Sequence, residues 1–215
     1  MNYLIIRAYK RDDYLARLCY ESWKLAGFEG EVIFYCQKKS PPTCTDEYNP
    51  FWIKDIGTIK FHDFVFYNYG GDVGAWAMLE AFRGIDFKDE DYVISCDTDI
   101  IIKKNPIDYL NKDTNFAGHG GTAENGFTHI SGQLQIIRGD ILRKITRDTN
   151  TDICNSEAIL SKYRVGICDD TYISYRMMQL GAKVQGLDKL WHHVKAYDYE
   201  PRTDWERIIQ PFLKY

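Results

Sequence analysis

The sequence predicts an α/β protein in which helices cover both faces of a mostly parallel central sheet. Short apolar runs of strand length alternate along the chain with segments whose apolar residues recur at helical spacing. The 215 residues are 45% apolar and 27% charged, which suits one domain with a sizeable core and excludes a mainly disordered chain. Because no internal repeat interrupts this pattern, we expect a single domain over residues 1–215.

The first half of the chain supplies four of the expected strands and two of the expected helices. The first helix opens at Asp12 and Asp13, since acidic residues favour a helix N-terminus, and it ends at Gly27. The second helix runs over Asp72–Arg83 and stops before Gly84. The apolar runs that predict strands are Tyr3–Ile6, Glu31–Cys36, Phe61–Tyr67 and Tyr92–Cys96.

The second half of the chain continues the alternation. Gln133–Ile137 is an apolar run that predicts a strand, and Asp170–Leu180 has helical spacing and stops at Gly181. Lys183–Leu187 follows as a short strand. Because ligands of such sheets bind beyond the carboxyl ends of the strands, the first candidates for a site are polar residues that directly follow a strand.

Two carboxylates follow the fourth apolar run. Asp97 and Asp99 come directly after Val93–Cys96, and the apolar run Ile100–Ile102 follows them. Residues two apart in an extended chain point to the same side, so both carboxylates are expected to converge on one object. An unpaired carboxylate is costly to bury between apolar segments, and a hard divalent cation with oxygen ligands offsets that cost. The spacing therefore predicts a metal site.

The charge and the cysteines narrow the class of protein. The net charge is −4, whereas nucleic-acid binders usually carry a basic excess. The six cysteines form no CxxC pair, which favours free thiols in a cytoplasmic protein. Tyr3–Ile6 is too short for a signal sequence or a membrane span. We expect no nucleic-acid partner, no membrane span and a cytoplasmic location.

Five motifs resemble, in their order along the chain, those of a nucleotide-sugar-dependent glycosyltransferase of the GT-A fold. The pair Asp97 and Asp99 is similar to the DxD motif of that family. The other segments that carry the resemblance are Ile6–Arg11, Ser131–Arg138, Asp169–Arg176 with Gly181–Lys183, and His192–His193. The resemblance covers most of the chain. It implies a Rossmann-like sheet with a nucleotide-binding half at about residues 1–102 and an acceptor-side half at about 103–215.

The resemblance implies a nucleotide-sugar donor that is held after the first and fourth strands. In the family the DxD carboxylates reach the ribose and a Mn²⁺ or Mg²⁺ ion on the diphosphate, so Asp97 and Thr98 are expected to contact the nucleotide. A uracil ring and a phosphate would approach the chain just after the first strand. The nucleotide-binding residues expected there are Arg7, Ala8, Tyr9 and Arg11.

The metal ligands implied by the resemblance come from the DxD motif and from the late histidines. Asp99 is the first choice for the metal contact, and Asp97 is shared between ribose and metal. One of His192 and His193 completes the coordination, and the sequence leaves open which of them does so. The cation would neutralise the charge that develops on the departing diphosphate.

The acidic pair Asp169 and Asp170 is the candidate for catalytic base. The N-terminus of a helix keeps a carboxylate ionised and able to accept a proton, and aspartate is also a favoured helix cap. We assign the cap to Asp169 and the base to Asp170, which favours an inverting transfer. A retaining enzyme could instead use both carboxylates to stabilise an oxocarbenium-like transition state.

The candidates for contacts with the sugars lie in the two halves of the chain. Gly132 and Gln133 belong to the segment that resembles the family's acceptor side, and Trp76 offers a flat apolar surface to a sugar ring. Trp76 and Ala77 stand where the family commonly presents a basic residue and an asparagine to the donor. That donor contact is therefore not assigned.

The sequence predicts a metal-dependent transfer of a hexose-type sugar from a nucleotide diphosphate sugar, a UDP-sugar, to a saccharide or other hydroxyl acceptor. One alternative is a haloacid-dehalogenase-like Mg²⁺-dependent phosphatase, but its DxD normally lies on the first strand rather than after the fourth. Another alternative is a sugar-binding module that keeps the fold without turnover. Retention of both acidic motifs and of the late histidines weighs against this second alternative.

Overall fold

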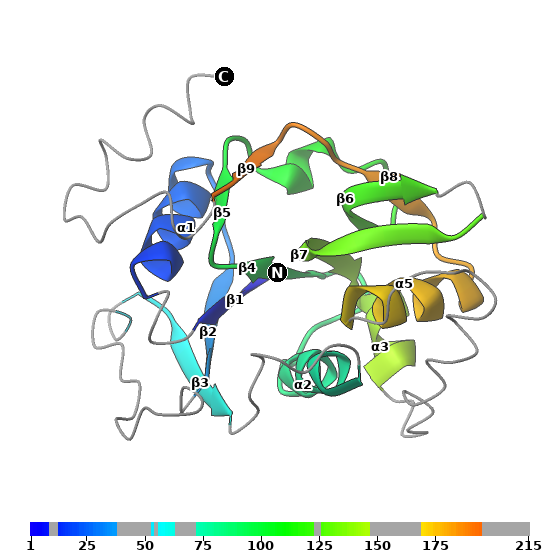
Figure 1. Cartoon of the computed structure of the whole chain (residues 1–215), viewed down its shortest axis with the longest axis horizontal. Coiled ribbons are helices and arrows are strands. Elements are labelled where there is room, and N and C mark those ends of the chain that lie inside the picture. The colour runs from blue at the N-terminus through cyan, green and yellow to red at the C-terminus, as the bar shows by residue number, and fades with distance from the viewer. Residues whose placement is uncertain are drawn as a thin grey trace.

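The computed structural model describes residues 1–8, 13–37, 53, 56–62, 72–122, 126–146 and 169–194. Its centre is a seven-stranded sheet with the strand order β3-β2-β1-β4-β7-β6-β8, and a second sheet pairs β5 with β9 (Figure 1). The fold is the mixed α/β architecture with a mostly parallel sheet that the sequence predicts. None of the described helices is long and apolar enough to cross a membrane.

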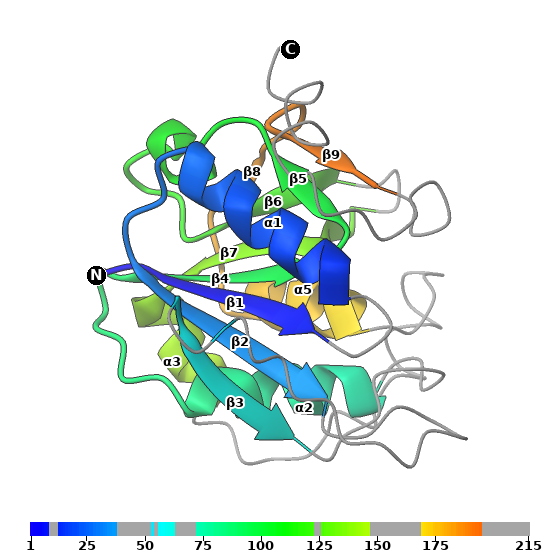
Figure 2. The same ribbon diagram turned by 90° about the vertical axis from the view of Figure 1, so that its left-hand side faces the viewer.

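The first four strands of the large sheet are parallel, and Figure 2 shows their arrowheads at one common edge. Three of them lie within a residue or two of the predicted bounds. The third is displaced: it was expected over Phe61–Tyr67, of which residues 63–67 lie outside the described part of the chain. Its sequence alternates polar and apolar residues, as an edge strand with one exposed face does, and therefore lacks a continuous apolar run. The bounds are β1 Tyr3–Ala8, β2 Glu31–Gln37, β3 Thr58–His62 and β4 Tyr92–Asp97.

Helices cover both faces of the sheet, as Figure 1 shows. Successive side chains of a strand point to opposite faces, so β1 contributes to two separate cores. Leu4 and Ile6 pack with Trp23 of α1 on one face, whereas Ile5 packs with Phe82 of α2 on the other. The helices are α1 Asp13–Leu25 on the first face, and α2 Asp72–Arg83, α3 Gly139–Thr146 and α5 Asp169–Gln179 on the second.

The other half of the large sheet contains β6 (Phe116–Thr122), β7 (Thr128–Arg138) and β8 (Val184–Gly186). Among the described strands of this sheet, β7 alone runs against the others. The sequence analysis missed β6, because glycine-rich segments have low strand propensity. Gly120 is required where β6 approaches β7: its φ is 142°, and an added Cβ would collide with the carbonyl oxygen of His129.

Two further differences from the sequence analysis concern short elements. Neither α3, which follows β7 without an intervening loop, nor the pairing of β5 (Ile100–Ile102) with β9 (Trp191–His193) is predicted from the sequence. A short 3-10 helix, Pro106–Tyr109, follows β5. The β5–β9 pair packs beside α1, where the Ser22 hydroxyl accepts a hydrogen bond from the backbone of β5.

The described cysteines agree with the expectation of free thiols. Cys19, Cys36 and Cys96 are free and buried. Burial raises the pKa of the Cys36 thiol to about 12, so this side chain is a neutral part of the core at physiological pH. The remaining cysteines, Cys44, Cys154 and Cys168, lie outside the described residues.

Candidate functional site

The ends of β1 and β4 bring the first two site residues together. The two strands are neighbours, and Arg7 lies opposite Asp97 in their register. The guanidinium of Arg7 is 11% exposed and donates to the carboxylate of Asp97. It also donates to the carbonyl oxygen of Gly132 on β7 at 2.7 Å. One mostly buried cation therefore links the end of β4 to β7.

The turn between β4 and β5 places the second carboxylate of the pair. Thr98 is buried in this turn, and Asp99 directs its Oδ2 toward Nε2 of His193 at 3.0 Å. The other carboxylate oxygen of Asp99, Oδ1, is buried and has no hydrogen-bond partner. A buried unsatisfied carboxylate oxygen is costly unless a cation or a donor reaches it. This atom is the clearest mark of a missing ligand in the described part of the chain.

The pairing of β9 with β5 separates the two late histidines. His193 lies opposite Ile100 in the register, and its Nδ1 is 3.3 Å from Nε2 of Gln133. Successive residues of a strand point to opposite sides, so His192 projects away from the side on which His193 meets Asp99. Burial, helped by the charge of Lys103 and by His193, lowers the pKa of His192 and favours its neutral form.

The donor set at this edge suits a hard divalent cation. Within the described residues, no three His, Cys, Asp or Glu side chains are grouped so as to hold a metal by themselves. Asp99 and His193 offer a carboxylate and an imidazole at one place, with Asp97 two residues away. Mg²⁺ and related ions commonly take one or two protein ligands and complete their shell with substrate phosphates and water. The residues present therefore fit a cation that arrives with a diphosphate.

The acceptor-side carboxylate Asp170 lies at the start of α5 and contacts β7. Its Oδ2 accepts a hydrogen bond from the backbone N–H of Gly132 at 2.8 Å, and its Oδ1 accepts one from Thr171 at 2.7 Å. Nε2 of His129 lies 3.2 Å from the same Oδ2. Because Gly132 also holds Arg7 through its carbonyl oxygen, the two acidic motifs of the sequence are linked through the backbone of a single residue.

Beyond the end of β4, side chains of α5 replace that strand as hydrogen-bond partners of β7. Asp170 is the last of the three α5 residues that do so. The pairing of β4 with β7 ends at Leu134, and beyond it the N–H groups of alternate β7 residues turn to side chains of α5. Two strand residues advance about 6.6 Å and four helix residues about 6.0 Å. Every second residue of β7 therefore lies beside every fourth residue of α5. The donor–acceptor pairs are Thr128 with Met178 at 3.2 Å, Ile130 with Ser174 at 3.0 Å, and Gly132 with Asp170 at 2.8 Å.

The structure brings together most of the predicted site residues that it describes. Those gathered at this edge are Arg7, Asp97, Thr98, Asp99, Gly132, Gln133, Asp170 and His193, with Ala8 buried at the end of β1. Tyr9 and Arg11 lie outside the described residues. Trp76 belongs to α2 and Asp169 begins α5, but their side chains are also outside the described part. His129 was missed, since no motif marks it and only the contact between β7 and α5 brings it to Asp170.

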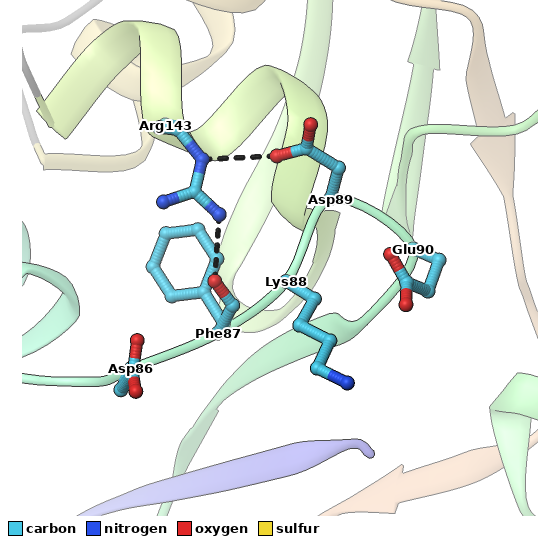
Figure 3. A pocket seen from close by; sticks show the side chains of 6 residues that line it. All are labelled: Asp86, Phe87, Lys88, Asp89, Glu90 and Arg143. Carbon is cyan, nitrogen blue, oxygen red and sulfur yellow. Dashed lines mark hydrogen bonds and ion pairs between the residues drawn. The ribbon is translucent and has the colours of Figure 1, made fainter.

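A second charged region lies at the opposite edge of the sheet. The segment Asp86–Glu90 precedes β4, and together with Arg143 of α3 it lines a shallow hollow (Figure 3). Arg143 donates to Asp89 at 2.9 Å and to the carbonyl oxygen of Phe87 at 2.6 Å, and it lies over the Phe87 ring. Among the described lining residues the one ion pair joins Arg143 to Asp89, and none of the lining residues comes from a predicted motif.

Comparisons of the sequence with known proteins give no match. No family model matches the chain, and no curated protein does. Solved structures, in contrast, share its fold at low sequence identity.

Three solved glycosyltransferases illustrate the shared fold. The galactosyltransferase LgtC, solved with donor and acceptor sugar analogues, is 14% identical with a TM-score of 0.53, over 86% of this chain and 73% of LgtC. The mannosyltransferase PcManGT from Pyrobaculum calidifontis, solved with GDP-Man and Mn²⁺, is 13% identical with a TM-score of 0.58, over 96% of this chain and 59% of PcManGT. GlyE of Streptococcus pneumoniae is 13% identical with a TM-score of 0.50, over 87% of this chain and 46% of GlyE.

The chain has the GT-A glycosyltransferase fold. The GT-A type expected from the motifs is thereby confirmed at the level of the fold. The chain spans less than two thirds of the length of PcManGT and less than half of the length of GlyE.

Proposed function

We propose that this protein is a metal-dependent glycosyltransferase, which moves a hexose-type sugar from a nucleotide diphosphate sugar to a saccharide or other hydroxyl acceptor. A UDP-sugar is the proposed donor. One observation carries the proposal: the buried, unpartnered oxygen of Asp99, beside His193, lies at the carboxyl edge of a GT-A type sheet. A carboxylate left in this state suits a site that is completed by a cation and its phosphate ligand.

Asp99 and His193 are the proposed protein ligands of Mn²⁺ or Mg²⁺, and Asp97 is shared between the metal and the ribose of the donor. The bound cation would act as a Lewis acid that neutralises the charge developing on the diphosphate. Gln133 supports this arrangement, because its amide nitrogen lies against Nδ1 of His193 and can fix the orientation of the ring. We assign no role in the metal site to His192.

The nucleotide is proposed to lie against the residues that follow β1, namely Arg7, Ala8, Tyr9 and Arg11, and against Thr98. Arg7 acts here as a positioning residue, because its guanidinium is already committed to Asp97 and to Gly132. PcManGT, with its GDP-Man and Mn²⁺, is an example of a nucleotide sugar and a cation bound together on a related fold. That example supports the class of donor proposed here, whereas the choice of uracil rests on the motifs alone.

The acceptor is proposed to bind on the β7 side of the same edge, near Gly132, Gln133 and Trp76. The acidic pair Asp169 and Asp170 supports removal of the acceptor's proton. Asp170 is suitably placed for this, since it stands at the N-terminus of α5 and contacts the β7 backbone at Gly132.

The test is thermal unfolding of the whole chain with UDP or GDP, with and without Mn²⁺, followed by a hydrolysis screen of UDP-glucose, UDP-galactose, UDP-N-acetylglucosamine and GDP-mannose. A ligand at 100 times its Kd stabilises the folded state by about 2.7 kcal/mol. We expect stabilisation by nucleotide only in the presence of the metal, and slow metal-dependent hydrolysis of one donor.

Two variants make this test specific. Asp99→Ala should abolish both the metal-dependent stabilisation and the hydrolysis, whereas Asp89→Ala, at the opposite edge, should leave both unchanged. Stabilisation without hydrolysis of any donor would support the non-turnover module. Metal-dependent hydrolysis of 4-nitrophenyl phosphate without any nucleotide effect would support the phosphatase.

A further inference from the structure

The imidazole of His193 lies between two side chains that favour the same tautomer. Its Nε2 is 3.0 Å from Oδ2 of Asp99, and its Nδ1 is 3.3 Å from the amide nitrogen of Gln133. An ionised carboxylate can only accept a hydrogen bond, and an amide NH₂ can only donate one. Nε2 therefore carries the proton of the neutral ring, and Nδ1 accepts the hydrogen bond from Gln133.

In this tautomer His193 cannot bind a cation through the atom that faces Asp99. A protonated Nε2 has no lone pair for a metal, and its proton is directed at Oδ2 of Asp99. Oδ1 of Asp99, in contrast, is buried without a hydrogen-bond partner. Because a ligating imidazole must present an unprotonated nitrogen, His193 can join Asp99 as a metal ligand only in its other tautomer.

The side chain of Gln133 can follow this change of tautomer without moving away from the ring. Its terminal torsion is close to two-fold, so a half turn exchanges Nε2 and Oε1 and leaves the shape of the side chain almost unchanged. After the turn, Oε1 would accept a hydrogen bond from a proton on Nδ1 of His193. A ligating histidine usually donates its other ring N–H to an acceptor of this kind. Gln133 can therefore partner both tautomers, whereas an apolar side chain could partner neither.

We propose that Gln133 is a positioning residue that lets His193 switch between two tautomers, one for the site without a cation and one for the site with a cation and a nucleoside diphosphate. This inference rests on the proposed glycosyltransferase function. In the switch, Nε2 gives its proton to water and Nδ1 takes one from water, so the ring stays neutral and no net proton is released. The amide of Gln133 turns at the same time. His193 then faces the cation through Nε2, and Oδ2 of Asp99 is released from its hydrogen bond.

A second histidine–aspartate pair, His119 with Asp188, is arranged differently. Its carboxylate faces Nδ1 of the ring, at 3.0 Å, and the ring meets Trp191 edge-on with 5.9 Å between centroids. Among the described residues, no side-chain amide reaches this ring, and the His119 side chain is 54% exposed. His119→Ala therefore serves as a control for adventitious metal binding by an exposed histidine and aspartate.

The first test follows the proton directly. Nitrogen-15 NMR of the histidine rings in the metal-free wild type, at about pH 8 where ordinary imidazoles are neutral, should show His193 protonated on Nε2. In the complex with UDP and Zn²⁺, a d¹⁰ ion that binds carboxylates and imidazoles, the proton should be on Nδ1. The signals are assigned by their loss in His193→Gln. A His193 ring protonated on Nδ1 without metal, or on Nε2 in the complex, overturns the proposal.

The second test measures the affinity for Mn²⁺ at saturating UDP by isothermal titration calorimetry. Gln133→Met keeps the length of the side chain but cannot accept from Nδ1, so Mn²⁺ binding should weaken by about 10- to 100-fold. Its metal-free ring should keep the proton on Nε2, since Asp99 still faces that atom. Gln179→Met, at an exposed glutamine of α5, and His119→Ala should bind Mn²⁺ as the wild type does. An affinity of Gln133→Met within about threefold of the wild type overturns the proposal.

The two proposals fail in different ways. If the wild type binds neither Mn²⁺ nor Zn²⁺ together with UDP, the glycosyltransferase function fails and the switch fails with it. If the wild type binds UDP with Mn²⁺ and Asp99→Ala does not, while Gln133→Met binds as tightly as the wild type or His193 keeps its proton on Nε2 in the complex, only the switch is overturned. Should Gln133→Met fail to fold, the ring spectra of the wild type decide.

Discussion

The two edges of the central sheet carry similar charged residues, but the pairing of carboxylates with cations differs between them. At the edge where β4 begins, two described carboxylates have cationic partners: the N-terminal ammonium of Met1 pairs with Asp91, and Arg143 pairs with Asp89. At the edge where β4 ends, Arg7 reaches Asp97, whereas Asp99 has only an imidazole partner and keeps one buried oxygen without any. The ion pairs at the first edge contribute to stability. At the second edge, a carboxylate oxygen of Asp99 is left able to bind a cation.

This difference explains how an acidic protein can be proposed to bind a diphosphate. The net charge of −4 predicts no basic surface for phosphate, and at the site edge the guanidinium of Arg7 is committed to Asp97 and to Gly132. A divalent cation held by the unsatisfied carboxylate would provide the positive charge instead. The comparison predicts different results at the two edges. At the site edge, the effects of substitutions should depend on one another, whereas at the other edge each substitution should only lower stability.

The largest loss of stability is expected from Arg7→Met, which strands Asp97 and the carbonyl of Gly132. Removing one partner of a buried ion pair costs about 3–5 kcal/mol, and since Asp97 retains some contact with water we expect about 3 kcal/mol. Urea unfolding measures this change. The double variant Arg7→Met/Asp97→Asn should lose less than the sum of the two single variants, because the pair acts as a unit. Additive losses would contradict the link across the site.

Asp91→Ala should give the largest loss at the opposite edge. The side chain is 2% exposed, and it accepts hydrogen bonds from the N-terminal ammonium and, at 2.7 Å, from the backbone N–H of Lys88. Losing these hydrogen bonds to a buried carboxylate costs about 1–3 kcal/mol, or roughly 2–12 °C in Tm for a chain of this size. Thermal unfolding checks the shift, and hydrolysis of the donor should remain at the wild-type rate below the transition.

Arg143→Ala should cost about 1 kcal/mol, because Arg143 loses its contact with the Phe87 ring together with two partly exposed hydrogen bonds. The control is Arg143→Lys, which keeps the charge but cannot keep both hydrogen bonds and should lie between the wild type and the alanine variant. Chemical denaturation of the three proteins gives the order. A change in UDP or Mn²⁺ binding in either variant would mean that the two edges are coupled.

The smallest effect is a pH-dependent one at Asp140. The hydrogen bond from Arg138, at 2.7 to 2.8 Å, lowers the pKa of the Asp140 carboxyl below its ordinary value. A lowered folded-state pKa contributes stability above the unfolded pKa of about 3.9, and this contribution is lost as the pH falls through the folded pKa. Asp140→Asn should therefore be less stable than the wild type by under about 1 kcal/mol at pH 7, since the pair is partly exposed. The difference should shrink below about pH 4, whereas a pH-independent difference would contradict it.

The parts of the fold that the sequence predicts well are those with local signals. The strands β1, β2 and β4 are apolar runs with clear boundaries. The helix α2 starts and ends at the predicted Asp72 and Arg83, and α5 lies within one residue of its predicted bounds. Asp97 and Asp99 could be found for the same reason, because a buried strand leads directly into them. Each of these signals is contained in a window of about a dozen residues.

The parts that could not be predicted depend on contacts between distant segments. The pairing of β5 with β9 decides which late histidine meets Asp99, and it joins residues more than 90 positions apart. His129 reaches Asp170 only because α5 packs along β7. The strand β6 lacks a sequence signal because it is rich in glycine. Its conformation is fixed by pairing with its neighbours rather than by its own strand propensity.

Because α5 replaces β4 beside part of β7, the proposed acceptor side of the site can change by substitution of single side chains. Where one strand lies beside another, backbone groups on both sides set the spacing, and a single substitution cannot move them. From Thr128 to Gly132, β7 still pairs with β6 on one edge, but on the other edge its partners are side chains of α5. These are contributed about one per helical turn by Met178, Ser174 and Asp170. Replacing one of these side chains would change the contact at one position of β7 and leave the sheet intact. On the proposed acceptor side, such exchanges would change the surface offered to an acceptor by one side chain at a time.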